Sequence, residues 1–120
     1  MITERRRFEM IDYAYGIEGL LAACSIFLTK CMITLGENEK RYGRYLVGRL
    51  DEVEDRSWMY DGRDREIMSR AISLLREARE MIMRIVEGED YSVRDVELLI
   101  QRLDNACVEL KSMVLSIYVP

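Results

Sequence analysis

Apolar residues recur along this chain at steps of three and four positions, the spacing that places them on one side of an α-helix. The pattern predicts four helices, over residues 4–35, 38–56, 62–87 and 92–118, and no segment alternates apolar and polar residues as a strand would. Short connections join these helices, which favours an all-α, antiparallel up-down four-helix bundle. Residues 1–120 contain no linker-like tract, so a single helical-bundle domain is expected.

The first predicted helix differs from the others because it carries apolar residues on two opposite sides. One stripe consists of Met10, Ala14, Ile17, Leu21, Cys24, Leu28, Cys31 and Leu35. The second stripe consists of Phe8, Ile11, Tyr15, Gly19, Ala22, Ile26, Thr29 and Ile33. Such a helix needs protein on both sides, whereas the remaining helices each offer one face. We therefore predict that the second stripe is an oligomer interface, with a two-fold homodimer as the default and a higher homo-oligomer as the alternative.

Capping residues and glycines delimit the helices. Thr3 suits the N-cap of the first helix, and Gly36 is expected to end it as a C-cap glycine. Gly88 is expected to end the third helix, and Ser92 is the clearest N-cap in the chain.

Glycines inside two of the helices lower their stability. Gly16 and Gly19 make a kink near them an alternative to a continuous first helix, with two shorter helices split near Tyr15 as the extreme case. The second helix, capped by Asn38, is the weakest, because it contains further glycines at positions 43 and 48. Its expected core face is narrow and consists of Tyr42, Leu46, Leu50 and Val53.

Three large side chains, Trp58, Met59 and Tyr60, occupy the turn between the second and third helices. Trp58 and Tyr60, with Arg63 beside them, are of the residue types that dominate the binding energy of protein interfaces. Two interpretations are open: the turn plugs one end of the bundle, or it forms a tip that binds an unidentified protein partner.

The complete absence of histidine excludes several classes of activity. Ser-His-Asp and Cys-His catalysis, histidine-ligated zinc and the Glu-x-x-His pairs of di-iron bundles all require this residue. Helical-bundle ribonucleases that depend on an Arg-x(4-6)-His motif are excluded for the same reason. We predict neither catalytic residues nor a bound cofactor or metal.

Carboxylates on adjacent turns leave one enzymatic alternative, because oxygen ligands could hold Mg²⁺. The pairs Glu77 with Glu80 and Glu87 with Asp90 superficially resemble the Glu-x-x-Glu and Glu-x-x-Asp motifs of all-α nucleotide pyrophosphohydrolases. The resemblance implies a Mg-dependent nucleotide hydrolase. The spacing from Glu80 to Glu87 is shorter than in that family, however, and Gly88 interrupts the second pair. Glu52 with Asp55 is a further carboxylate pair of this kind.

A second alternative is an accessory subunit that contacts nucleic acid. Arg41 and Arg44 alternate with Tyr42 and Tyr45, a composition that can stack on bases. The net charge of −4 and the even mixing of both signs argue against broad nucleic-acid binding. Helical packing is expected to account for both tyrosines.

Cysteine usage and the lack of a signal-like segment favour the cytoplasm. Cys24, Cys31 and Cys107 lie on apolar stripes and are expected to be buried thiols, with a Cys24–Cys107 disulfide as the alternative.

The stretch from Gly19 to Leu35 is short for a membrane span, so we do not expect a membrane protein. The excess of arginine over lysine and the scarcity of amides are compatible with a thermophilic source, and GC-rich coding would leave a similar trace.

Overall fold

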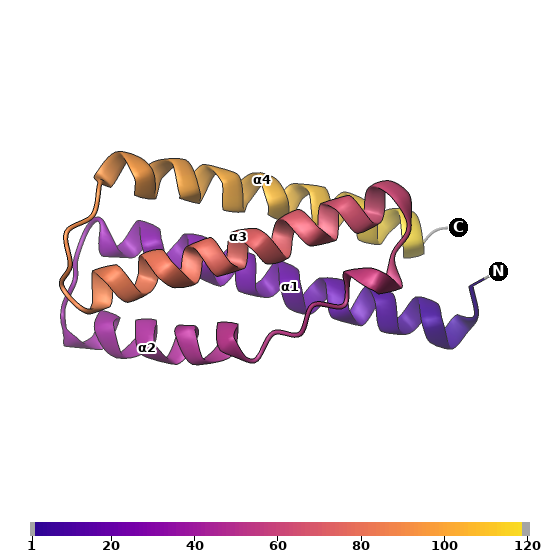
Figure 1. Ribbon diagram of the computed structural model, residues 1–120, viewed down its shortest axis with the longest axis horizontal. Helices are drawn as coiled ribbons and strands as arrows, with labels where there is room; N and C mark the ends of the chain where they lie inside the picture. The colour runs from indigo at the N-terminus through magenta and orange to yellow at the C-terminus, as the bar shows by residue number, and fades with distance from the viewer. Residues whose placement is uncertain (1, 119–120) are drawn as a thin grey trace.

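The computed structural model describes residues 2–118 and forms an all-α four-helix bundle, which confirms the predicted fold (Figure 1). Its elements are α1 (Glu4–Cys31), α2 (Glu37–Asp51), the single-turn 3₁₀ helix η1 (Ser57–Met59), α3 (Gly62–Val86) and α4 (Val93–Tyr118). The part of the chain that the structure describes contains no strand. The bundle is elongated and measures 50 × 24 × 18 Å.

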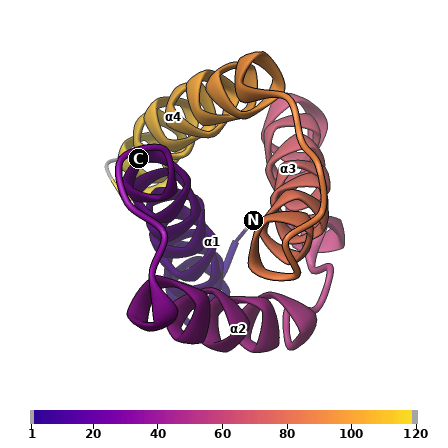
Figure 2. The same cartoon turned by 90° about the vertical axis from the view of Figure 1, so that its left-hand side faces the viewer.

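Successive helices run in opposite directions around a shared core. Viewed from one end, the order around the bundle is α1, α2, α3 and α4 (Figure 2). α1 and α4 form a long antiparallel pair, while α1 and α3 also contact each other across the bundle. The core stripe predicted for α1 is buried from Met10 to Cys31, together with matching stripes of α3 and α4. Helix packing therefore follows directly from the apolar periodicity.

α1 is one unbroken helix, so the alternative of two shorter helices is wrong. Thr3 caps it as predicted, since its hydroxyl oxygen accepts a hydrogen bond from the Arg6 amide at 3.1 Å. The helix ends at Cys31, four residues before the predicted boundary, so Ile33 and Leu35 both lie outside it and are exposed. Gly16 and Gly19 sit in open space on its outer side and cause no interruption.

α2 is shifted and shorter than predicted. Gly36 does not close α1; it begins α2, and its amide donates a hydrogen bond to the Glu39 carboxylate at 2.8 Å. α2 then stops at Asp51, so residues 52–56 are not helical. The other boundaries agree with the sequence pattern: Gly88 follows α3 with a φ of 75°, and the Ser92 hydroxyl accepts from the Asp95 amide at 3.3 Å.

The segment after α2 covers the part of the core that this short helix leaves open. Met59 and Tyr60 are buried there, and η1 packs against α3. The Tyr60 hydroxyl donates a hydrogen bond to the backbone carbonyl of Met10 at 2.6 Å. The nearby Tyr13 hydroxyl accepts from the Arg56 amide at 3.1 Å. These bonds fasten an irregular segment to α1.

Gly43, which the sequence pattern marks only as a weak point of α2, lies where α2 approaches α1 and α3 most closely. A Cβ atom at this position would lie 2.6 Å from Val86 Cγ2 and 2.8 Å from Phe27 Cζ. Gly43 and its neighbours Leu46 and Val47 form the buried face of α2. Tyr42 is not part of that face, because 45% of its surface is exposed, so its predicted core position is wrong.

Replacing Gly43 with alanine is expected to lower the free energy of unfolding by about 1–2 kcal/mol, because overpacking outweighs the gain in helix propensity. Gly48, on the same helix, is the matched control, because a Cβ atom there would meet no other atom within 4 Å. At Gly48, alanine is expected to stabilise the protein by about 0.5–1 kcal/mol. Urea unfolding followed by circular dichroism measures both changes. Equal stabilisation at the two positions would contradict the close approach.

Candidate interaction surface

The second stripe of α1 lies on the outside of the bundle and is not covered by the other helices. Ile26 and Ile33 are 69% and 83% exposed, and Phe8, Tyr15, Gly19 and Thr29 are exposed as well. Ile11 and Ala22 are half-buried at its edges. Six of the eight residues predicted for the oligomer interface therefore face solvent fully. Their role in association stays a prediction.

α4 extends this apolar surface beside α1. Val108 and Leu115 are 66% and 64% exposed and lie on the outward side of α4. Their neighbours Asp104, Cys107 and Lys111 all contact residues of α1, while Val108 also borders a hollow that Arg63 and Ile67 of α3 line. We call the combined surface the α1/α4 face; it consists of Phe8, Tyr15, Gly19, Ala22, Ile26, Ile33, Val108 and Leu115. The two helices that carry it, α1 and α4, lie side by side at the left and top of Figure 2.

Polar groups at the seam between the two helices are paired within the chain. The Ser25 hydroxyl donates to Asp104 Oδ1 at 2.6 Å, and Lys111 Nζ lies 3.8 Å from Glu18 Oε1. The other oxygen of Glu18 is buried and accepts no hydrogen bond within the described residues. Apart from this oxygen, the polar groups at the seam are paired within the chain, so the apolar residues beside the seam dominate what a partner would meet.

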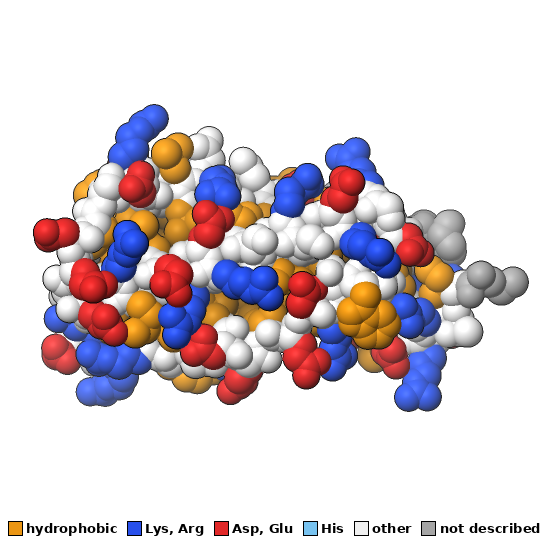
Figure 3. All heavy atoms as spheres, in the orientation of Figure 1, with side chains coloured by type: hydrophobic (Ala, Val, Ile, Leu, Met, Phe, Trp, Pro, Cys, Tyr) orange, Lys and Arg blue, Asp and Glu red, His pale blue; other side chains and the backbone are white. Residues whose placement is uncertain are grey.

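The opposite side of the bundle has a different character. Lysine, arginine, aspartate and glutamate side chains are interspersed over the face drawn in Figure 3. Arg70 pairs with Glu109 at 3.1 Å, and Arg102 pairs with Glu77 at 2.9 Å, so these ion pairs bridge α3 and α4. They flank a shallow groove of about 390 Å³. This mixture is typical of a solvated surface.

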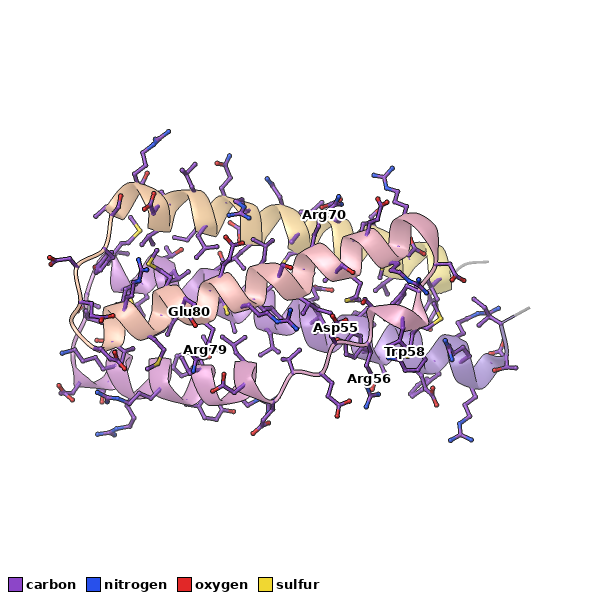
Figure 4. The ribbon with its side chains drawn as sticks, in the orientation of Figure 1. Asp55, Arg56, Trp58, Arg70, Arg79 and Glu80 are labelled. Carbon is purple, nitrogen blue, oxygen red and sulfur yellow. The ribbon has the colours of Figure 1, made fainter. Side chains whose placement is uncertain are left out.

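The predicted tip does not hold its three residues together on the surface. Tyr60 is completely buried, which agrees with the interpretation of the turn as a plug. Trp58 is exposed, and the Arg6 guanidinium lies 5.2 Å from the centre of its ring (Figure 4). Arg63 is also exposed. Of the three predicted tip residues, Trp58 and Arg63 are therefore accessible to a partner and Tyr60 is not.

The tyrosines of α2 lie outside the core. Tyr42 stacks at the surface between Phe27 and Tyr45, with ring centres 5.8 and 6.0 Å apart. Arg41 and Arg44 are exposed on the same helix. Contact with nucleic acid through these residues stays an alternative, although α2 as a whole has a net charge of only +1, with four basic and three acidic residues.

The carboxylate pairs proposed for Mg²⁺ are engaged elsewhere or exposed. Glu80 pairs with Arg79 at 3.1 Å, and Arg79 also binds Asp51 at 2.8 Å (Figure 4). The Ser57 hydroxyl and amide donate to Asp55, which lowers the pKa of that carboxyl. Within residues 2–118, no three carboxylate or thiol side chains converge as metal ligands would. The hydrolase alternative gains no geometric support.

All three cysteines are buried free thiols, in agreement with the primary expectation and not with the Cys24–Cys107 disulfide. Burial raises the pKa of Cys24 to about 12, and the neighbouring Cys107 adds to the effect. Burial also raises the pKa of Cys31 to about 11. The thiols are therefore protonated at neutral pH, which makes them poor nucleophiles.

α1 is long and apolar enough to cross a membrane, with a mean hydropathy of 1.4 in its most apolar window. The central helix of a soluble bundle meets the same criterion, and the core stripe of α1 is buried by α2, α3 and α4.

Comparison with known proteins adds no assignment: no family model, curated protein or solved structure matches this chain.

Proposed function

We propose that this protein is a non-enzymatic helical bundle that self-associates through the α1/α4 face and acts as an interaction or structural module. The observation that supports the proposal is the row of large exposed apolar side chains Phe8, Tyr15 and Ile26 along the outside of α1, continued by Ile33 in the turn that follows the helix. Exposed apolar patches of this extent on a soluble domain mark surfaces that bind protein.

The dimensions of the face suit a second copy of the chain. α1 has 28 residues, and at a rise of about 1.5 Å per residue it is about 40 Å long. Two adjacent helices form a surface about 20 Å wide, so the face measures about 800 Å². This equals the area that each partner buries in a standard protein interface. A second copy brings an apolar surface of the same size, and closed two-fold symmetry buries both at once.

The mass in solution tests the proposal directly. Light scattering at tens of micromolar is expected to give twice the chain mass of 14.2 kDa. A monomer at that concentration would contradict the proposal. Flotation with lipid vesicles in the same buffer provides the second arm, since a monomer that binds vesicles would assign the face to a membrane.

Replacing Ile26 with glutamate is expected to raise the dimer dissociation constant about 50-fold. A two-fold interface contains this residue twice, so each of the two glutamates would place a charge in an apolar contact. Tyr45 is the matched control, since it is 60% exposed but lies on α2, away from the face. Tyr45→Glu should leave the dissociation constant within about two-fold of wild type. Sedimentation equilibrium measures both variants, and an equal effect at the two positions would contradict the assigned surface.

A further inference from the structure

The outward stripe of α1 is nearly symmetrical in residue size about its own midpoint. Tyr15 and Ile26 lie at equal distances in sequence from a point between residues 20 and 21, and so do Phe8 and Ile33, with Ile33 two residues past the end of α1. Gly19 and Ala22 flank the same point. Large side chains therefore occupy both ends of the stripe, and small residues occupy its centre.

This symmetry has a specific meaning for a dimer. In a two-fold interface, if one residue contacts a second residue of the partner, the second contacts the first in return. When the two α1 helices run antiparallel, each residue meets its counterpart across the midpoint. Tyr15 then faces Ile26 of the other copy, while Gly19 faces Ala22, where the small residues let the backbones approach.

The charges beside the stripe favour the same arrangement. Asp12 and Lys30 are both exposed, and both lie along one edge of the stripe, on the side away from α4. Neither forms an ion pair within the described residues, in contrast to the paired groups at the seam with α4. An antiparallel dimer brings Asp12 of each copy beside Lys30 of the other. A parallel two-fold dimer would place the two copies of this edge on opposite sides of the interface, so neither ion pair would form.

α4 is compatible with this geometry. The Cys107 thiol donates to the Glu18 carbonyl at 3.7 Å, and Asp104 binds Ser25, so this part of α4 lies level with the midpoint of the α1 stripe. Val108 is exposed at that level. In a two-fold dimer it would meet its own copy beside the helix crossing and extend the apolar contact from α1 to α4.

We propose that two copies of the chain pair with their α1 helices antiparallel, that the two-fold axis passes between Gly19 and Ala22, and that reciprocal Asp12–Lys30 ion pairs select this register. The inference rests on the proposed self-association. It adds the orientation of the partner and the pair of charges that sets it.

Charge exchange tests the ion pairs. Asp12→Lys and Lys30→Asp are each expected to raise the dissociation constant about 10-fold at low ionic strength, because each replaces two attractions with two repulsions. The double variant restores opposite charges and should return to within about two-fold of wild type. Glu66→Lys, a reversal at an exposed position of α3, is the control and should change little. Additive losses in the double variant would overturn the proposed register.

Cysteine cross-linking tests the orientation independently. The double variant Tyr15→Cys/Ile26→Cys should form a covalent dimer on mild oxidation, while Tyr15→Cys alone should not. In the antiparallel register the two copies of position 15 lie about 16 Å apart along the helices, beyond the reach of a disulfide. The native thiols are buried and should not compete.

The outcomes separate this inference from the proposed function. Efficient cross-linking of Tyr15→Cys to itself would show a parallel pair and overturn the inference, while self-association through α1 would stand. A wild-type chain that remains monomeric would overturn both.

Discussion

Replacing Leu28 with alanine is expected to lower the free energy of unfolding by about 3–4 kcal/mol. Leu28 is completely buried in the core stripe of α1. The substitution removes several buried methyl and methylene groups and leaves a cavity that the surrounding helices can fill only in part. Urea unfolding followed by the fluorescence of Trp58, the single tryptophan, measures the loss.

Ile26, on the same helix but on the outward stripe, is the matched control for this experiment. Because it is 69% exposed in the single bundle, Ile26→Ala should change the stability of the monomer by no more than about 0.5 kcal/mol. Fluorescence allows both variants to be measured at submicromolar concentration, where association contributes little. Similar losses at Leu28 and Ile26 would mean that the chain itself covers both sides of α1.

A steep loss of stability is expected as the pH rises from 9 to 11. The ordinary pKa of a cysteine is 9.0, whereas burial raises that of Cys24 to about 12 and that of Cys31 to about 11. Above pH 9 the unfolded chain releases these protons and the folded chain retains them, so alkali favours unfolding. At pH 11 the two thiols together account for about 4 kcal/mol of lost stability. Their contribution is fully present below pH 9.

Urea titrations at a series of pH values, with a phosphine reductant present, measure this dependence. Cys24→Ala removes one of the titrating thiols, so its loss of stability between pH 9 and 11 should be smaller by about 2 kcal/mol, whatever its stability at neutral pH. An unchanged pH dependence in this variant would contradict the assignment to Cys24. Buried Tyr60, whose pKa burial also raises, accounts for a further decline at higher pH.

The sequence pattern was most informative where a long helix buries one continuous stripe. α3 and α4 begin and end within one residue of the predicted boundaries, because their periodic apolar residues and flanking caps agree. The two stripes of α1 were also correctly separated into a buried and an outward set, apart from the half-buried Ile11 and Ala22 and the exposed Leu35. Local spacing alone determines which residues of a helix lie on the same side.

Prediction was least accurate around α2, where neighbouring helices decide the outcome. Periodicity placed Tyr42 in the core, but Tyr42 is exposed and the neighbouring Gly43 is buried instead. At position 43, α2 approaches Phe27 so closely that only the hydrogen atom of a glycine fits. The buried face of α2 is rotated accordingly, and Tyr42 is displaced to the surface. No local signal reveals such an approach, since a glycine in a helix reads from sequence only as a weak helix former.

The spacing of apolar residues along one chain was therefore enough to establish the all-α class, the number of helices and the two-sided character of α1. The sequence also indicated which stripe of α1 faces outward, but the extent to which each of its residues is exposed could be read only from the packed helices. That extent depends on the short α2, on the burial of Tyr60 beneath the following turn, and on the seam that α4 forms with Ser25 and Glu18. These contacts join residues far apart in sequence, so only packing in three dimensions determines the exposed surface.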